Sequence, residues 1–123
     1  MAWGLNNDRP IYIQLVEMME REIVSGHYAL GAHLPSVREL ALDAGVNPNT
    51  MQKAFAELEA RGLVCTQRTA GRSITQDVEA VANIRKSLAA QETKCFLNNM
   101  LKLGFSADET LAVVSRTLKE DEK

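Results

Sequence analysis

The chain has 123 residues, of which 46% are hydrophobic and 24% are charged. This length allows one compact domain with an extension, and the composition is typical of a folded protein rather than a disordered one. The net charge of −2 disfavours a protein that binds nucleic acid regardless of sequence, because such binding depends mainly on neutralising phosphates. A local basic patch is compatible with this charge, so the placement of the basic residues matters.

The hydropathy pattern and the N-terminal sequence predict a cytoplasmic protein without a membrane segment. No apolar run approaches the roughly 18 to 20 residues that a membrane-spanning helix needs. The segment from Asn6 to Arg9 is polar, unlike the apolar stretch of a signal peptide.

The two cysteines do not predict a metal centre. Cys65 and Cys95 have apolar neighbours and are expected to be buried thiols, which commonly behave as small hydrophobic residues. A zinc site needs cysteines or histidines at short spacing, whereas His27 and His33 lie far along the chain from either cysteine. No metal and no cofactor are therefore expected.

The first predicted helix begins after Pro10, whose ring suits the first turn of a helix. Apolar residues recur at helical spacing from Ile11 to Ile23, and the helix is expected to stop before Gly26. Residues 27–35 predict a turn followed by a short extended piece.

Cap signals predict two further helices. Ser36 and Glu39 have the spacing of a capping box, in which hydroxyl and carboxylate each accept a hydrogen bond from an otherwise unpaired backbone N–H. This helix is expected to end near Gly45, and Asn47 then caps a third helix with Pro48 in its first turn. The apolar stripe of the third helix comprises Met51, Ala54, Phe55 and Leu58.

A hairpin and a long helix are expected next. Residues 63–67 and 73–75 are short, partly β-branched segments on either side of residues 68–72, and they predict two strands joined by a turn. From about Asp77 to Leu103 the chain has no glycine or proline and predicts one long helix.

The expected fold class is mainly α with a small β-hairpin. Ser106 and Glu109 repeat the capping-box spacing before a last helix. Residues 1–76 are expected to form a winged helix-turn-helix, because two short helices joined by a tight turn precede a hairpin. Residues 77–123 contribute the two C-terminal helices.

The start of the third helix is the strongest candidate for a functional surface. Its amide, hydroxyl and ammonium groups can hydrogen-bond base edges or phosphates, and free backbone amides are expected at the helix start. Taken singly, each of these polar residues could instead be a cap or part of a solvated face. The candidate DNA-binding residues are Arg38, Asn47, Asn49, Thr50, Gln52, Lys53, Arg68, Gly71 and Arg72.

Many separate positions between about residues 10 and 75 resemble the GntR-type DNA-binding domain. The resemblance implies that Arg38 and the start of the third helix, with the wing, contact operator DNA. The wing departs from the usual family pattern, because Gly71 keeps the flexible tip but the aromatic residue that normally follows is missing. The resemblance is carried by Pro10-Ile11-Tyr12, Gln14-Leu15, Ile23-Val24-Ser25-Gly26, Gly31, Leu34-Pro35-Ser36-Val37-Arg38-Glu39-Leu40-Ala41, Val46-Asn47-Pro48-Asn49-Thr50-Met51, Lys53-Ala54-Phe55, Leu58-Glu59 and Gly62-Leu63-Val64.

The C-terminal helices are similar to those of the small YtrA-like subfamily, which implies that they mediate dimerisation. The physical argument agrees, because two helices alone cannot enclose a core and need a partner for their apolar faces. The alternative is that both helices fold back on the first domain. The candidate dimerisation residues are Val81, Ile84, Leu88, Phe96, Met100, Leu111, Val114 and Leu118.

These observations predict a bacterial transcription regulator, with a repressor favoured, that binds an inverted-repeat operator in double-stranded DNA as a homodimer. Two copies of the third helix would enter successive major grooves about one helical turn apart. The alternative is a winged-helix module that binds another protein, which steep salt dependence would exclude. An enzyme is not expected, because the sequence has no phosphate-binding glycine loop or metal-ligand cluster.

A small-molecule effector is left open. A pocket between the C-terminal helices, lined by Phe96, Met100 and Phe105, would suit an unidentified ligand. The alternative is that these apolar residues belong to a core or an interface. The sequence assigns no ligand.

Overall fold

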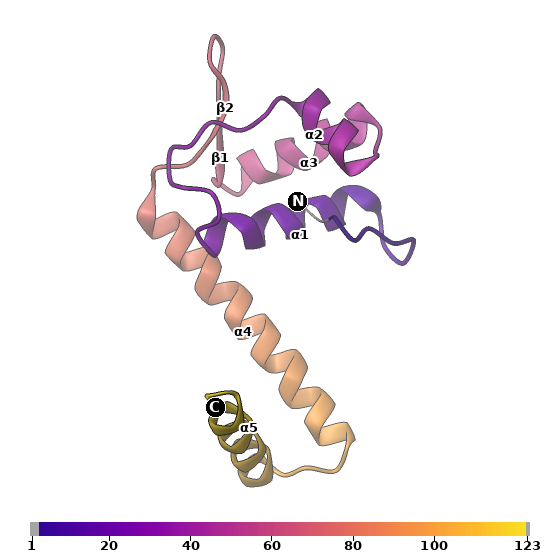
Figure 1. Cartoon of the computed structure of the whole chain (residues 1–123), viewed down its shortest axis with the longest axis vertical. Coiled ribbons are helices and arrows are strands. Elements are labelled where there is room, and N and C mark those ends of the chain that lie inside the picture. The colour runs from indigo at the N-terminus through magenta and orange to yellow at the C-terminus, as the bar shows by residue number, and fades with distance from the viewer. Residues whose placement is uncertain (1–2, 123) are drawn as a thin grey trace. The chain divides into compact units, whose positions relative to one another are not determined.

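The computed structural model describes residues 3–122, which form five α-helices and one two-stranded antiparallel sheet (Figure 1). The fold class expected from the sequence, mainly α with a small hairpin, is confirmed. The chain divides into two compact units, Met1–Arg85 and Lys86–Lys123, and the boundary between the two units lies inside a helix. The elements are α1 (Ile11–Val24), α2 (Val37–Ala44), α3 (Pro48–Ala60), β1 (Val64–Gln67), β2 (Gly71–Ile74), α4 (Val78–Lys102) and α5 (Ala107–Asp121).

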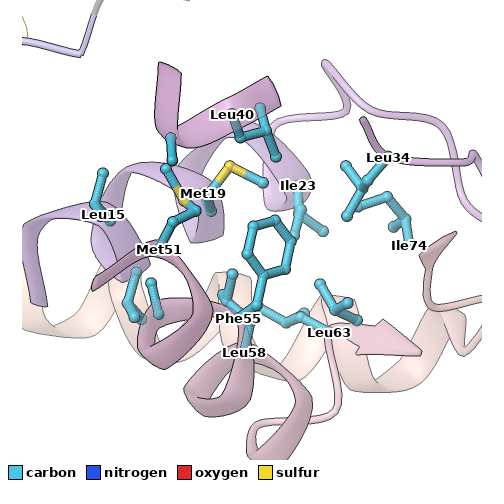
Figure 2. Close-up of a cluster of buried hydrophobic side chains, with 14 of the residues drawn as sticks. Leu15, Met19, Ile23, Leu34, Leu40, Met51, Phe55, Leu58, Leu63 and Ile74 are labelled. Atoms are coloured by element: carbon cyan, nitrogen blue, oxygen red, sulfur yellow. The ribbon is translucent and has the colours of Figure 1, made fainter. Parts of the chain in front are cut away.

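The core of the first unit (Met1–Arg85) lies where α1, α3 and the hairpin meet. Phe55 of α3 lies between apolar residues of α1 and of the hairpin (Figure 2). The stripe expected for α3 is confirmed, since all four of its members are buried. The largest fully buried side chains are Phe55, Leu15, Met19, Ile23, Met51, Leu58, Leu63, Ile74 and Val16.

Polar contacts fix α1 within this unit. The buried Gln14 side chain donates hydrogen bonds to the carbonyls of Asn6 and Arg9, and it accepts one from the Asn6 N–H. The carboxylate of Glu20, also buried, lies 2.8 Å from an Arg61 guanidinium nitrogen at the end of α3. The hydrogen bond from the Arg61 guanidinium to Glu20 raises the pKa of Arg61. Buried polar groups of this kind need such partners. The Gln14 hydrogen bonds therefore hold the segment before α1 against that helix, and the Glu20–Arg61 pair holds α1 against the end of α3.

The helix-turn-helix is formed by α2 and α3, with caps close to those expected. The Ser36 hydroxyl accepts from the Glu39 N–H at 3.1 Å, but the reciprocal half of the capping box is different. The Glu39 carboxylate accepts a hydrogen bond from the Ser36 hydroxyl, with 3.3 Å between the two oxygens, rather than from the Ser36 backbone N–H. Gly45 ends α2 with φ +70°, a conformation that favours glycine.

The hairpin begins its second strand earlier than the sequence predicts. β2 starts at Gly71 rather than at residue 73, and Gly71 pairs with Gln67 across the hairpin. The extended piece before α2 accounts for the difference, since the Leu34 N–H donates to the Arg72 carbonyl at 2.9 Å and His33 bridges Ser73. This third segment favours extended backbone at Arg72, so the turn is confined to residues 68–70.

The second unit (Lys86–Lys123) contains most of α4 and all of α5. The capping box at the start of α5 is complete: the Ser106 N–H donates to the Glu109 carboxylate, and the Glu109 N–H donates to the Ser106 hydroxyl. α4 contains no buried residue among those described, and in α5 only Thr110 is buried. Both helices therefore leave apolar side chains unburied within the chain.

Two further findings bear on the sequence predictions. Cys65 and Cys95 are both exposed, so the expectation of buried thiols is wrong: Cys65 lies on the outward side of a two-stranded hairpin, and Cys95 lies on a helix with no buried residue. Among residues 3–122, no helix combines the length and the apolar character needed to cross a bilayer.

Candidate nucleic-acid interface

The exposed face of α3 collects the polar residues that the sequence singled out. Because the apolar stripe of α3 is packed into the core, residues at the complementary helical positions face solvent. Asn49, Gln52 and Lys53 are spaced three and four residues apart, so they share one face, and all three are exposed. Thr50 is half-buried.

The start of α3 is more self-contained than expected. The Asn47 side-chain oxygen accepts from the Asn49 N–H at 2.8 Å, and the Asn47 carbonyl accepts from the Thr50 N–H at 3.0 Å. Pro48 has no N–H to offer. The expectation of free backbone amides here is therefore wrong, and Asn47 has an observed role as the cap.

Lys53 has a neighbour that sequence reasoning missed. Its Nζ lies 4.0 Å from the centroid of the Tyr12 ring, which comes from α1. This is the geometry of a cation–π contact, which orients the ammonium group while leaving it charged. The pair joins residues far apart in the sequence, so spacing alone could not reveal it.

Two exposed arginines of the neighbouring elements have no ion-pair partner among the described residues. Arg38, in the first turn of α2, and Arg68, in the hairpin turn, are exposed. None of the ion pairs among residues 3–122 involves either of them. By contrast, Arg9 pairs with Glu17 at 2.6 Å, and the hydrogen bond from Arg9 lowers the pKa of Glu17.

Arg72 occupies a different environment. Its side chain is 22% exposed, its Nε lies 3.5 Å from a carboxylate oxygen of Glu59, and its guanidinium carbon lies 5.4 Å from the centroid of the Phe55 ring. The same Glu59 oxygen accepts a hydrogen bond from the Thr66 hydroxyl. Arg72 therefore lies against α3, whereas Gly71 beside it is exposed.

The residues expected to mediate dimerisation fall into two groups. Val81 and Ile84, at the start of α4, pack against the core of the first unit. The others lie on α4 and α5, and several are well exposed: Phe96 (41%), Leu111 (67%) and Leu118 (60%). Leu88, Met100 and Val114 are half-buried.

The second unit contains an apolar groove between its two helices, with a volume of about 540 Å³. Phe96 lines it, whereas Met100 and Phe105, which the sequence placed in a pocket here, are not among its lining residues. The lining residues are Glu92, Thr93, Phe96 and Leu97 of α4 and Ala107, Thr110, Leu111 and Val114 of α5.

Some known proteins resemble only the first unit of this chain, and others resemble most of its length. Residues 11–74 match the family described as bacterial regulatory proteins, gntR family. The HTH-type transcriptional regulator YhcF of Bacillus subtilis is 34% identical over 105 residues, which are 85% of this chain and 87% of that protein. The HTH-type transcriptional repressor YtrA of Bacillus subtilis is 41% identical over 70 residues, 57% of this chain and 54% of that protein.

Solved structures of transcriptional regulators also resemble this chain. A GntR family transcriptional regulator from Listeria monocytogenes superposes with a TM-score of 0.85 at 38% identity, over 91% of this chain and 98% of that one. The DNA-binding domain of AraR, in complex with operator ORE1, has a TM-score of 0.53 at 25% identity, over 61% of this chain and 94% of that one.

Proposed function

Because the chain belongs to the gntR family of bacterial regulatory proteins, whose members are DNA-binding transcriptional regulators, we propose that it represses transcription from an inverted-repeat operator as a homodimer. The observation that carries the proposal is the exposed face of α3, where Asn49, Gln52 and Lys53 project from a helix whose opposite face is locked in the core. Operator binding in the cytoplasm would then block access of the transcription machinery.

The chemistry of this face suits double-stranded DNA. Asparagine and glutamine amides can pair with adenine edges in the major groove, and lysine and arginine suit phosphate or guanine. Thr50, at the first turn of α3, would reach a phosphate or a base edge, while the Asn47 cap holds the helix start. Exposed Arg38 and Arg68 would contact the backbone on either side of α3, with Gly71 allowing close approach of the wing.

A second copy of the chain is the proposed partner of the C-terminal helices. Within the chain, α4 and α5 bury almost none of their apolar side chains, and Leu111 and Leu118 are more than half exposed. Burying apolar surface is the main favourable term in association. Dimerisation would also supply the two α3 helices that an inverted repeat requires.

The proposal is tested by binding of the protein to the duplex upstream of its own gene. Arg38→Ala and Lys53→Ala should each lower the affinity by about tenfold, because each removes a charge-assisted hydrogen bond. The salt dependence should also become shallower, by about 0.9 in the slope of log K against log salt for each lost phosphate contact.

Lys119→Ala is the matched control, since it removes the same charge from the last turn of α5. It should leave both the affinity and the salt slope unchanged. Wild-type affinity in both Arg38→Ala and Lys53→Ala would show that this face is misassigned. Binding that does not weaken as salt rises would indicate a protein partner instead.

A further inference from the structure

We propose that Arg72 and Glu59 are positioning residues that anchor the wing to α3, and that Arg72 does not itself contact DNA. The inference rests on the proposed DNA binding and separates Arg72 from the wing residues that would touch the duplex. It depends on one side-chain cluster, formed by Phe55 and Glu59 of α3 with Thr66 and Arg72 of the hairpin.

The cluster joins both strands to one carboxylate. Thr66 and Arg72 face each other across the hairpin, and both approach the same oxygen of Glu59. Glu59 lies in the last turn of α3, so the contact is made close to where the chain leaves the helix for β1. Apart from this link, the backbone pairing of Arg72 and Ser73 with the segment before α2, and the core residues at the hairpin base, the outer part of the hairpin is exposed.

The position of the Arg72 guanidinium argues against a phosphate contact. Its Nε is buried and makes no hydrogen bond among the described residues, and its guanidinium carbon lies over the fully buried Phe55 ring. Moving this group onto DNA would take it away from the Phe55 ring and leave the Glu59 carboxylate without its cation. Arg68, one step beyond β1, is exposed and has no such constraint.

Anchoring matters because α3 and the wing must contact one duplex together. A two-stranded hairpin alone is at best marginally stable. Backbone pairing with the segment before α2 holds β2 at Arg72 and Ser73, and the direction of the outer part of the hairpin depends also on its side-chain contacts. The Glu59–Arg72 pair would fix the direction of the strands and hence the distance from Arg68 to the exposed face of α3. Preorganisation of this kind lowers the entropy cost of binding without adding a contact.

Binding to a duplex that the wild-type protein selects from a random-sequence library tests the proposal. The variants are Arg72→Met, which keeps an apolar stem over Phe55, Glu59→Ala, and the double variant. Each single substitution should weaken binding about fivefold, and the double variant should be no weaker than either, because the two act through one contact. The slope of log K against log salt should stay at the wild-type value in all three.

Arg68→Met is the control for a direct contact, and its salt slope should become shallower by about 0.9. The opposite pattern would overturn the proposal. If the salt slope of Arg72→Met is shallower by about 0.9 and Glu59→Ala binds as tightly as wild type, Arg72 is a phosphate contact. Additive losses in the double variant would also overturn it.

Hydrogen exchange in the DNA-free protein provides a second, independent test. In Arg72→Met and Glu59→Ala, the amides of β1 and β2 should exchange faster, while those of α1 and α3 stay protected as in wild type. Unchanged protection of the hairpin would refute the anchor. This measurement needs no DNA, so failure of the anchor and failure of the proposed function are distinguishable.

Discussion

Leu58 and Leu42 are both helical leucines of the first unit, but only Leu58 contributes to the core. Leu58 is fully buried, and Leu42 is 85% exposed. Leu58→Ala should lower the free energy of unfolding by about 2 to 5 kcal/mol, because it removes buried methyl groups and leaves a cavity beside Phe55. Leu42→Ala should change it by less than about 0.5 kcal/mol. Denaturant unfolding followed by circular dichroism measures both, and equal losses would contradict the assignment of the core.

Some single residues could be identified from the sequence and others could not. The buried stripe of α3 was predictable, because its caps and its spacing fix which positions share a face. The burial of Trp3 was not predictable, since its Nε1 donates to Asp43 of α2, forty residues away along the chain. The same applies to Tyr12 beside Lys53 and to Glu59 beside Arg72, which only tertiary packing brings together.

At the scale of elements, helix starts were predictable because their caps are local. Ser36, Asn47 and Ser106 each cap the helix that the sequence assigns to them. The start of β2 was not predictable, because it depends on pairing with the segment around His33 and Leu34, which lies far back in the chain. The extent of a short strand is decided by its partners more than by its own residues.

The capping box of α5 predicts a pH-dependent stability of that helix. Hydrogen bonds from the Ser106 backbone and hydroxyl lower the pKa of Glu109. A carboxylate whose pKa is lower in the folded than in the unfolded state stabilises the fold above its unfolded pKa, and this contribution is lost as pH falls through the folded pKa. Glu109→Gln should therefore melt at a lower temperature than wild type at neutral pH.

The difference between wild type and Glu109→Gln should shrink as the solution is acidified below the ordinary glutamate range. Thermal melts over a pH series measure it. Glu120→Gln removes the same charge from the other end of α5 without touching the capping box, so its difference from wild type should not follow this course. A Glu109→Gln difference that grows on acidification would contradict the box.

At the scale of the whole molecule, the distribution of buried apolar residues is uneven. The first unit has a core to which its helices and its hairpin all contribute, whereas the helices of the second unit leave leucines such as Leu101 and Leu111 largely exposed. Proteins in solution rarely leave large apolar patches uncovered. This contrast, rather than any single residue, supports the proposal of a second copy.

Leu111→Glu tests that proposal most directly. Leu111 lines the groove of the second unit and is 67% exposed, so a glutamate fits the isolated chain without disturbing a core. In a dimer the same carboxylate would be buried without a partner, which is strongly unfavourable. Sedimentation velocity should give wild type twice the chain mass of 13.6 kDa and the variant the mass of one chain.

Leu42→Glu introduces the same charge at an exposed position of α2 and should remain a dimer, which separates loss of the interface from a general effect of charge. Loss of the dimer should weaken binding to a duplex with two half-sites far more than binding to one half-site, because the second α3 is then no longer tethered to the first. A wild-type monomer, or a Leu111→Glu variant that still sediments as a dimer, would show that the α4 and α5 groove does not join two copies.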